Sequence, residues 1–141
     1  MASSIGLDVA PVNLRDAAEI DRDVTALAGT PNSGLIVTAS ALSFVHSTLI
    51  LGLASRHKLP AVYSRRSFTA AGGLISYGFD AVDQVRRAAG YVDRILKGEK
   101  PADLPVQAPT KYQLVVNLKT AKELGIVIPP LVLSRADEAL E

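Results

Sequence analysis

Hydrophobic and polar positions repeat along this chain in two periods, one typical of strands and one typical of helices. Short apolar runs predict strands at residues 5–12, 35–39, 61–64, 74–77 and 112–116. Apolar residues at helical spacing predict helices at residues 16–28, 41–57, 80–97 and 119–124. Strands that alternate with helices predict an α/β fold, with an open parallel sheet covered by helices on both faces.

Acidic residues mark the starts of two of these helices. Asp16 is predicted to cap the first, with Glu19 three residues on as in a capping box. Asp80 is predicted to cap the long helix at 80–97, and Gly98 follows its end. That helix carries an apolar stripe of two heptads, which is too short for a coiled coil and indicates a core face or a contact with a missing partner. The stripe consists of Val82, Val85, Ala89, Val92 and Leu96.

Composition fits one globular domain over residues 1–141. A chain of this length buries roughly 68–70% of its unfolded surface, so its core needs no disulfide or structural metal. Fifteen basic and fourteen acidic residues leave a net charge of +1, which argues against a nucleic-acid or anionic-membrane partner. The absence of cysteine excludes disulfides, thiolate metal sites and a cysteine nucleophile.

Two segments bear on membranes and export. Residues 35–55 carry no charge and are long enough for a membrane span, but their many hydroxyl side chains favour a buried strand followed by a core helix. The N-terminus has no basic region, and Asp8 interrupts its apolar run. It therefore predicts no signal peptide and a cytoplasmic location for the chain expressed as given.

The stretch AGGLISYG at residues 71–78 could be a phosphate loop, a catalytic elbow or a crossing between lobes. It has no lysine and leads into a strand, so it is not a phosphate loop. Ser40 stands at a strand–helix junction but without the glycines of a hydrolase elbow. His46 and His57 lie on one predicted helix and form neither a triad nor a metal site. We expect no catalytic residue, no metal and no cofactor.

Hydroxyl side chains gather where the predicted strands end. Ligands of open α/β sheets bind beyond the carboxyl ends of the strands, so these residues predict a surface for hydrogen bonding and stacking on a small polar or aromatic molecule. The alternative is that the two tyrosines merely cap the sheet. Adjacent Arg65 and Arg66 could clamp a carboxylate, but as neighbours in a connector they are expected to face solvent. The residues at the strand ends are Thr38, Ser40, Tyr63, Ser64, Ser76 and Tyr77.

Three segments together resemble one protein family. They are GLIVTASAL, LPAVYSRRSFTAAGGLISYGFD and the long run from AAGYVDRILKGEKPADLPVQ to LVVNLKTAKELGIVIPP. In this order they resemble the C-terminal part of ABC-transporter substrate-binding proteins of the type that includes tryptophan- and tyrosine-binding members. The resemblance covers nearly the whole chain.

The resemblance implies one lobe of a two-lobed periplasmic receptor with the type I binding-protein fold, which is Rossmann- or flavodoxin-like. Such receptors close on a solute and deliver it to an ABC permease. AGGLISYG would then be a crossing between lobes, and the following helix would pack on the other lobe. The same resemblance places four residues in the cleft: Ser40, Tyr63, Ser64 and Tyr77.

The chain departs from the family in length, because the receptors run to roughly twice its size, with an export signal and a second lobe. We therefore expect a truncated receptor lobe whose half-cleft binds weakly, and whose exposed helix stripe favours a homodimer or a segment swap. Two other functions stay open: a flavodoxin-like association module without a ligand, and a small hydrolase that uses Ser40.

Overall fold

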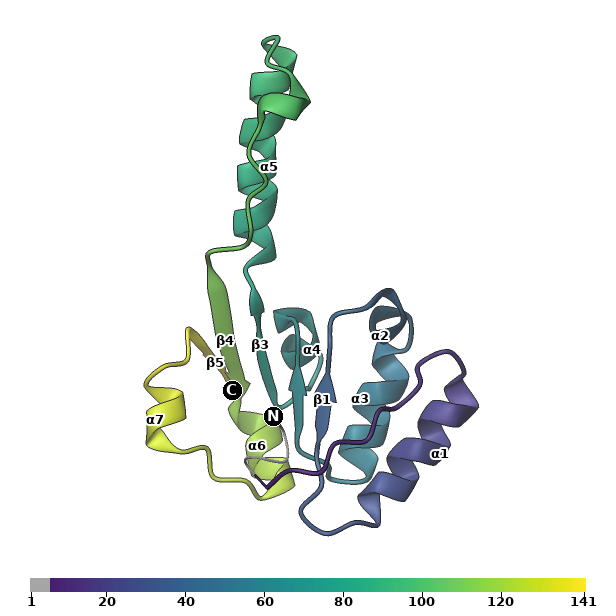
Figure 1. Cartoon of the computed structure of the whole chain (residues 1–141). Helices are drawn as coiled ribbons and strands as arrows, with labels where there is room; N and C mark the ends of the chain where they lie inside the picture. Colours follow the sequence, from purple (N-terminus) through teal and green to yellow (C-terminus); the bar gives the residue numbers. More distant parts are fainter. Residues whose placement is uncertain (1–5) are drawn as a thin grey trace. The chain divides into compact units, whose positions relative to one another are not determined.

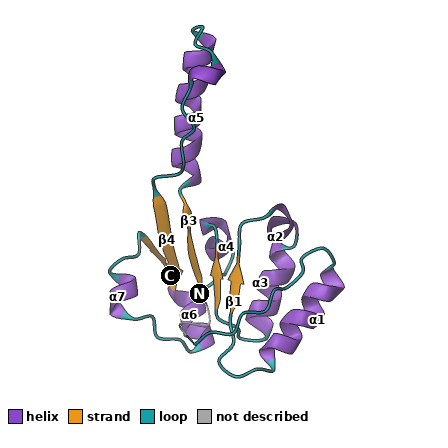
Figure 2. Cartoon of the chain, viewed as in Figure 1, coloured by secondary structure: helices purple, strands orange, loops and turns teal. Residues whose placement is uncertain are grey.

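The computed structural model describes residues 6–141 and divides the chain into two compact units, Met1–Ala61 and Val62–Glu141. The strands follow the order β1-β2-β3-β4-β5, and the division falls inside β2. Figure 2 shows helices and strands in alternation along the chain. The prediction of an α/β fold is confirmed, whereas a single domain over the whole chain stays a prediction.

The first unit is built on the packing of two helices. Ile20 and Val24 of α1 are buried, as are Ile50 and Leu53 of α3, so an apolar face of each helix lies in the core. Asp16 caps α1 as predicted, because its Oδ1 accepts a hydrogen bond of 2.8 Å from the Ala18 N–H. The elements are α1 (Ala17–Ala28), β1 (Leu35–Val37), α2 (Ala41–Val45) and α3 (Ser47–Arg56).

Three expectations for the first unit are wrong. Ile5 lies outside the described residues, and residues 6–12 form no strand, since Leu7 and Val9 are 54% and 64% exposed and bury no face. Glu19 forms no capping box, because its carboxylate accepts a hydrogen bond from the Asn13 side chain instead. The helix expected at 41–57 is interrupted at His46, whose backbone leaves the helical region.

The second unit contains a mixed sheet. Strand β2 (Ala61–Tyr63) pairs in parallel with β3 (Ile75–Phe79), and β4 (Tyr112–Asn117) pairs in parallel with β5 (Glu138–Leu140). Strands β3 and β4 are antiparallel, so the expectation of a parallel sheet holds only in part. The reason is the connection between the two strands. The chain leaves the sheet at the end of β3 and re-enters it beside that end, so β4 runs in the opposite direction.

The core of this unit lies between the sheet and its C-terminal helices. Leu74, Val116, Ala121 and Ile128 are its buried centre. Two helices and a strand were missed by sequence reasoning: α4 falls in the basic connector, where Phe68 is buried, and α7 and β5 fall in the C-terminal tail. The helices are α4 (Arg66–Ala70), α5 (Ala81–Leu96), α6 (Leu118–Leu124) and α7 (Pro130–Leu133), with a 3-10 turn at Pro101–Asp103.

Helix α5 follows β3, and the segment that returns to β4 runs alongside it (Figure 1). Polar contacts hold the two together: the Tyr91 hydroxyl donates to the Pro105 carbonyl at 2.5 Å, and Arg87 donates to the Thr110 hydroxyl at 2.6 Å. No residue of α5 is buried. The predicted stripe is therefore exposed, with Val85 at 70% and Leu96 at 82%. No helix in the described residues is both long and apolar enough to cross a membrane.

The glycines of AGGLISYG admit close contacts. A Cβ at Gly78 would lie 1.9 Å from the Ser64 carbonyl oxygen, and one at Gly73 would lie 2.6 Å from the Tyr63 ring. Gly72 has φ +105°, in the region that favours glycine. These glycines thus allow β2 and β3 to approach closely around Tyr63 and Ser64.

We expect Gly78→Ala to destabilise the protein by about 1–3 kcal/mol, because the new methyl group must displace backbone. Thermal unfolding followed by circular dichroism measures this. The matched control is Gly90→Ala in α5, where a Cβ meets nothing within 4 Å. That substitution should stabilise the helix by about 0.5–1 kcal/mol. Equal unfolding temperatures for the two variants would contradict the close contact.

Candidate functional site

The four predicted site residues fall in both units. Ser40 lies in the first unit, and Tyr63, Ser64 and Tyr77 lie in the second. Ser40 is exposed and caps α2, because its Oγ accepts a 3.0 Å hydrogen bond from the Ser43 N–H while Ser43 Oγ reaches back to the Ser40 backbone. This reciprocal capping box gives Ser40 a structural role at the end of β1.

Tyr63 is part of the core of the second unit. Its side chain is 2% exposed and stacks on Phe68, with ring centroids 5.1 Å apart. Burial raises the pKa of its phenol to about 12, so the hydroxyl stays protonated at any physiological pH. A buried ring can support the surface above it but presents little area to a solute.

Two serine hydroxyls of this region are buried without a hydrogen-bond partner in the described residues. They are Ser64 Oγ, just past the end of β2, and Ser76 Oγ, in β3. Both serines are neighbours of the buried Tyr63: Ser76 is its register partner on β3, and Ser64 follows it in sequence. Unpartnered buried hydroxyls are uncommon in native proteins, because each costs desolvation that no hydrogen bond returns. They leave hydrogen-bonding capacity at the end of β2.

Tyr77 is the exposed member of the predicted set, at 59%. Its ring stacks on that of Tyr112, with centroids 5.7 Å apart and planes inclined by 22°. Sequence reasoning missed Tyr112 because it assumed a parallel sheet. The antiparallel register pairs Tyr77 with Leu114, which places Tyr112 two residues along on the same face.

Arg65 and Arg66 behave differently. The Arg65 guanidinium lies 4.5 Å from the centroid of the Phe79 ring and is partly buried. Arg66 makes a bidentate ion pair with Glu138 of β5, with both N–O distances at 2.6 Å. This pair raises the pKa of Arg66 and lowers that of Glu138. Arg66 therefore ties α4 to β5.

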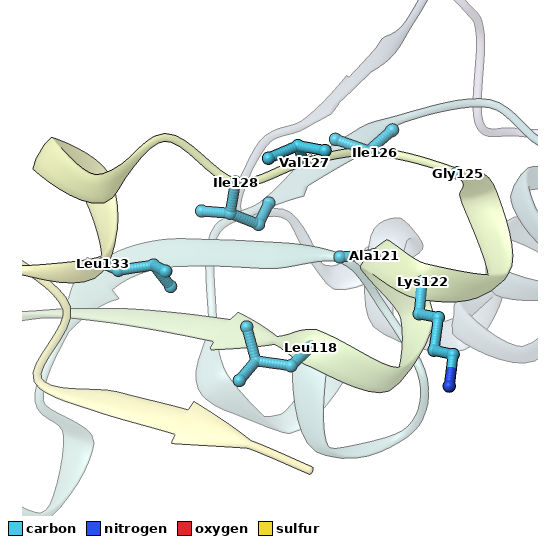
Figure 3. Close-up of a pocket in the computed structure, with 8 residues that line it drawn as sticks. All are labelled: Leu118, Ala121, Lys122, Gly125, Ile126, Val127, Ile128 and Leu133. Atoms are coloured by element: carbon cyan, nitrogen blue, oxygen red, sulfur yellow. The ribbon is translucent and has the colours of Figure 1, made fainter.

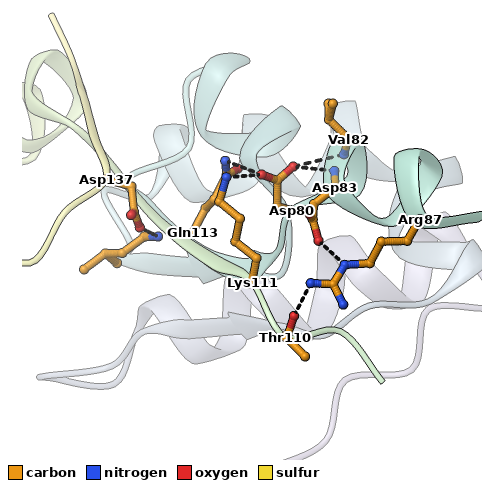
Figure 4. A network of polar contacts seen from close by, with 9 residues as sticks. Asp80, Val82, Asp83, Arg87, Thr110, Lys111, Gln113 and Asp137 are labelled. Carbon is orange, nitrogen blue, oxygen red and sulfur yellow. Dashed lines mark hydrogen bonds and ion pairs between the residues drawn. The ribbon is translucent and has the colours of Figure 1, made fainter. Parts of the chain in front are cut away.

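A polar network surrounds Asp80 where β3 leads into α5 (Figure 4). Asp80 Oδ1 accepts hydrogen bonds from the N–H groups of Val82 and Asp83 at 3.0 and 3.1 Å. Its other oxygen meets Gln113 Nε2 at 3.2 Å and Lys111 Nζ at 3.1 Å. The carboxylate thus connects the first turn of α5 to the start of β4.

The same contacts set the protonation of Asp80. The Asp83 N–H, followed by the hydrogen bond from Lys111, holds the pKa of Asp80 below its ordinary value of 3.8. Beside it, Asp83 pairs with Arg87 at 2.8 Å, and Arg87 reaches Thr110 on the return segment. Figure 4 shows these contacts as one continuous network. It connects the start of α5 to the end of the segment that returns from α5 to β4.

The second unit also has an open apolar groove of about 490 Å³ beside α6 (Figure 3). Lys122 is its one charged lining residue, and its aliphatic lining comes from α6, α7 and the segment between them. The groove brings together no converging polar groups, which a small-molecule site needs for orientation. It contains none of the predicted site residues. The lining residues are Leu118, Ala121, Lys122, Gly125, Ile126, Val127, Ile128 and Leu133.

The described residues bear on a metal site and on the hydrolase that would use Ser40. No group of three His, Asp or Glu residues there could hold a metal ion. His57 Nε2 lies 3.3 Å from the Thr25 hydroxyl, and the Ser40 hydroxyl caps a helix. Within the described residues, Ser40 therefore has no histidine hydrogen bond of the kind that activates a hydrolase serine.

The chain is similar to one protein family over nearly its whole length. The profile of the ABC transporter substrate binding protein family matches residues 1–140. The chain belongs to this family. A comparison with curated protein sequences found no match.

Solved structures agree with the family. A conserved domain protein from Vibrio cholerae O1 biovar El Tor has a TM-score of 0.85 and 27% identity over 98% of this chain. An ABC domain from Streptococcus pneumoniae, in complex with L-Trp, has a TM-score of 0.86 and 29% identity over 99% of this chain. A ligand-free, open substrate-binding protein with adhesive properties from Clostridium difficile shares the fold, with a TM-score of 0.68 and 21% identity over 99% of this chain.

The chain spans about half the length of these structures, with 46%, 47% and 46% of them covered in the same order. The family assignment and the α/β fold confirm the resemblance seen in the sequence. The role of the four site residues stays a prediction.

We expect Asp80→Ala to lower the thermal midpoint by several degrees at neutral pH, since it removes a helix cap and the Lys111 ion pair. Because the pKa of Asp80 is lowered by folding, its contribution exists above the unfolded value of about 3.9 and is lost as the pH falls through the folded value. The difference in thermal midpoint between wild type and variant should thus disappear below about pH 4. Circular dichroism melts over pH test this, with exposed Asp103→Ala as control. A gap that does not change with pH would contradict the ionic role.

Proposed function

We propose that this chain is the C-terminal lobe of a solute-binding protein that serves an ABC transport system. The protein binds a small molecule such as an amino acid in a cleft between lobes, in the periplasm, and hands it to a membrane permease. It acts without catalysis. The observation that carries the proposal is an exposed aromatic ring at Tyr77, in the middle of β3, next to the end of β2, where the buried Ser64 hydroxyl has no partner in the described residues.

The contact between these strands supports this arrangement. Gly78 follows Tyr77, and only its lack of a side chain lets the Ser64 carbonyl approach so closely. Ser64 therefore lies just past the end of β2, a position at which open α/β sheets bind ligands, beside Tyr77 and Gly78 of the neighbouring strand. A solute there would gain a stacking surface from the exposed Tyr77 ring.

The other two predicted residues have supporting roles in the proposal. Tyr63 is buried beside Ser64 in the second unit, whereas the Ser40 hydroxyl, in the first unit, caps α2. The relative from Streptococcus pneumoniae binds L-Trp, which makes aromatic amino acids the first solutes to test. Half a cleft should bind weakly, since closure of two lobes adds contacts from the other side.

A thermal-shift titration with amino acids tests the function. A solute at 100 times its Kd adds about 2.7 kcal/mol, or a rise of several degrees at this size. We expect a concentration-dependent rise for the wild type that Tyr77→Leu reduces to near zero. The control is Tyr91→Leu, because Tyr91 lies on α5 away from the strand ends. No shift with any amino acid, or equal losses in both variants, would refute the proposal.

A second candidate function is self-association through α5, as a homodimer. The specific observation is the arrangement of its two faces. The polar face makes the ion pairs and hydrogen bonds to the return segment, through Arg87, Tyr91 and Arg94. The opposite face presents Val82, Val85, Val92 and Leu96 at 54–82% exposure. An exposed apolar stripe of this kind favours association with another apolar surface.

Charge placed on the stripe tests this association. We expect Val85→Glu to raise the dimer dissociation constant roughly tenfold or more, because burying an unpaired carboxylate costs more than about 1.4 kcal/mol. Light scattering over a concentration series gives the mass. Gln84→Glu adds the same charge beside the stripe and should change little. A monomeric wild type at high concentration would exclude this second function.

A further inference from the structure

We propose that the open edge of β1 is a self-association surface, on which the β1 strand of a second copy of this chain pairs antiparallel across a two-fold axis. The inference does not depend on solute binding, and it concerns the first unit rather than α5. Strand β1 (Leu35–Val37) is first in the strand order, so a strand lies along only one of its sides within the described residues.

The backbone of β1 shows which of its groups are free to pair. The Leu35 N–H donates to the Pro60 carbonyl at 2.9 Å, so the backbone of Leu35 points toward the side that is already occupied. Successive strand residues direct their N–H and C=O groups to opposite sides, and those of Ile36 therefore point to the open edge. A row of unpaired backbone groups is a template for pairing with another chain.

The side chain of Ile36 suits the same contact. It is 75% exposed, whereas Val37 beside it is 8% exposed. Isoleucine is β-branched, and such residues pack well against the residue directly opposite on a neighbouring strand. A two-fold axis at Ile36 places this residue opposite its own copy, and the two residues exchange both backbone hydrogen bonds. One position thus supplies hydrogen bonds and apolar contact together.

The edge lacks the features by which proteins usually prevent such pairing. Exposed edge strands are commonly protected by charged residues, by proline or by bulges. Residues 24–55, which include β1 and both of its flanks, contain no Asp, Glu, Lys or Arg, and β1 itself contains no proline. Two copies can therefore approach along β1 without repulsion between like charges on these residues.

The last strand in the order differs from β1. Strand β5 (Glu138–Leu140) carries a carboxylate at Glu138, and exposed Glu141 follows its end. Two copies that met along β5 would bring like charges together, which destabilises cross-strand pairs. The contrast favours β1 as the self-pairing edge. Because a strand of three residues buries little area, the dimer is expected to be weak and to form at high concentration.

A single cysteine tests the pairing, because the sequence has none of its own. Opposed residues of a hydrogen-bonded antiparallel pair have Cα atoms about 5.5 Å apart, which a disulfide can bridge. We expect the chain with Ile36→Cys to form a covalent dimer under mild oxidation at least about tenfold faster than Ala102→Cys, since pairing holds the two thiols together. Ala102 is an exposed control position in the second unit. Equal rates for the two variants would overturn the proposal.

Charge variants test the register. Ile36→Lys should raise the dissociation constant of the dimer roughly tenfold, because two like charges then lie opposite each other. Ile36→Thr is β-branched and uncharged and should pair nearly as well as the wild type. An equimolar mixture of the Ile36→Lys and Ile36→Glu variants should restore the dimer, because opposite charges then face each other. Light scattering up to about 1 mM protein gives the mass.

The remaining outcomes separate β1 from α5. If Val85→Glu dissociates the dimer and Ile36→Lys does not, the copies associate through α5 and the β1 pairing is wrong. A wild type that stays monomeric at the highest concentration, or a mixture of charge variants that stays monomeric, also overturns the proposal. Thermal melts show that each variant is folded, as expected for substitutions of a side chain that is mostly exposed.

Discussion

The antiparallel pairing of β3 with β4 is the interaction on which the second unit depends. It joins the two parallel pairs, β2 with β3 and β4 with β5, into one mixed sheet. It buries Val115 and Val116 and brings Tyr77 to Tyr112. It also brings together the two ends of residues 81–110, the segment of α5 and its return to β4, called here the α5 excursion. There the Asp80 carboxylate accepts hydrogen bonds from both ends. The core, the aromatic pair and the base of α5 therefore share one set of backbone hydrogen bonds.

Periodicity and helix caps predicted much of this fold. Asp16 and Asp80 cap the helices that they were expected to cap, and the apolar runs at Leu35, Ala61 and Ile75 are strands. Each of these signals is local, because a cap or a run depends on residues within a few positions. The stripe on α5 was also predicted, although its burial depends on a partner that periodicity cannot reveal.

Features that depend on distant residues were missed. Helix α4 is short and begins at the second of two adjacent arginines, so its sequence was interpreted as a connector; the stacking of Phe68 on Tyr63 holds it in the fold. Strand β5 contains Glu138, and pairing with β4 together with the Arg66 ion pair holds it in the sheet. Tyr112 joined the candidate site only once the strand direction was known. Strand direction follows from the route of the chain, which no local pattern encodes.

The two ends of the α5 excursion lie side by side, since the Asp80 N–H bonds to the Lys111 carbonyl. Two strand ends joined by such a backbone hydrogen bond can be connected by a two-residue hairpin turn. Nothing in the buried core of the second unit comes from α5. The excursion is consequently separable: a designer could replace residues 81–110 with a tight turn and keep the sheet, or exchange them for another helix without redesigning the core.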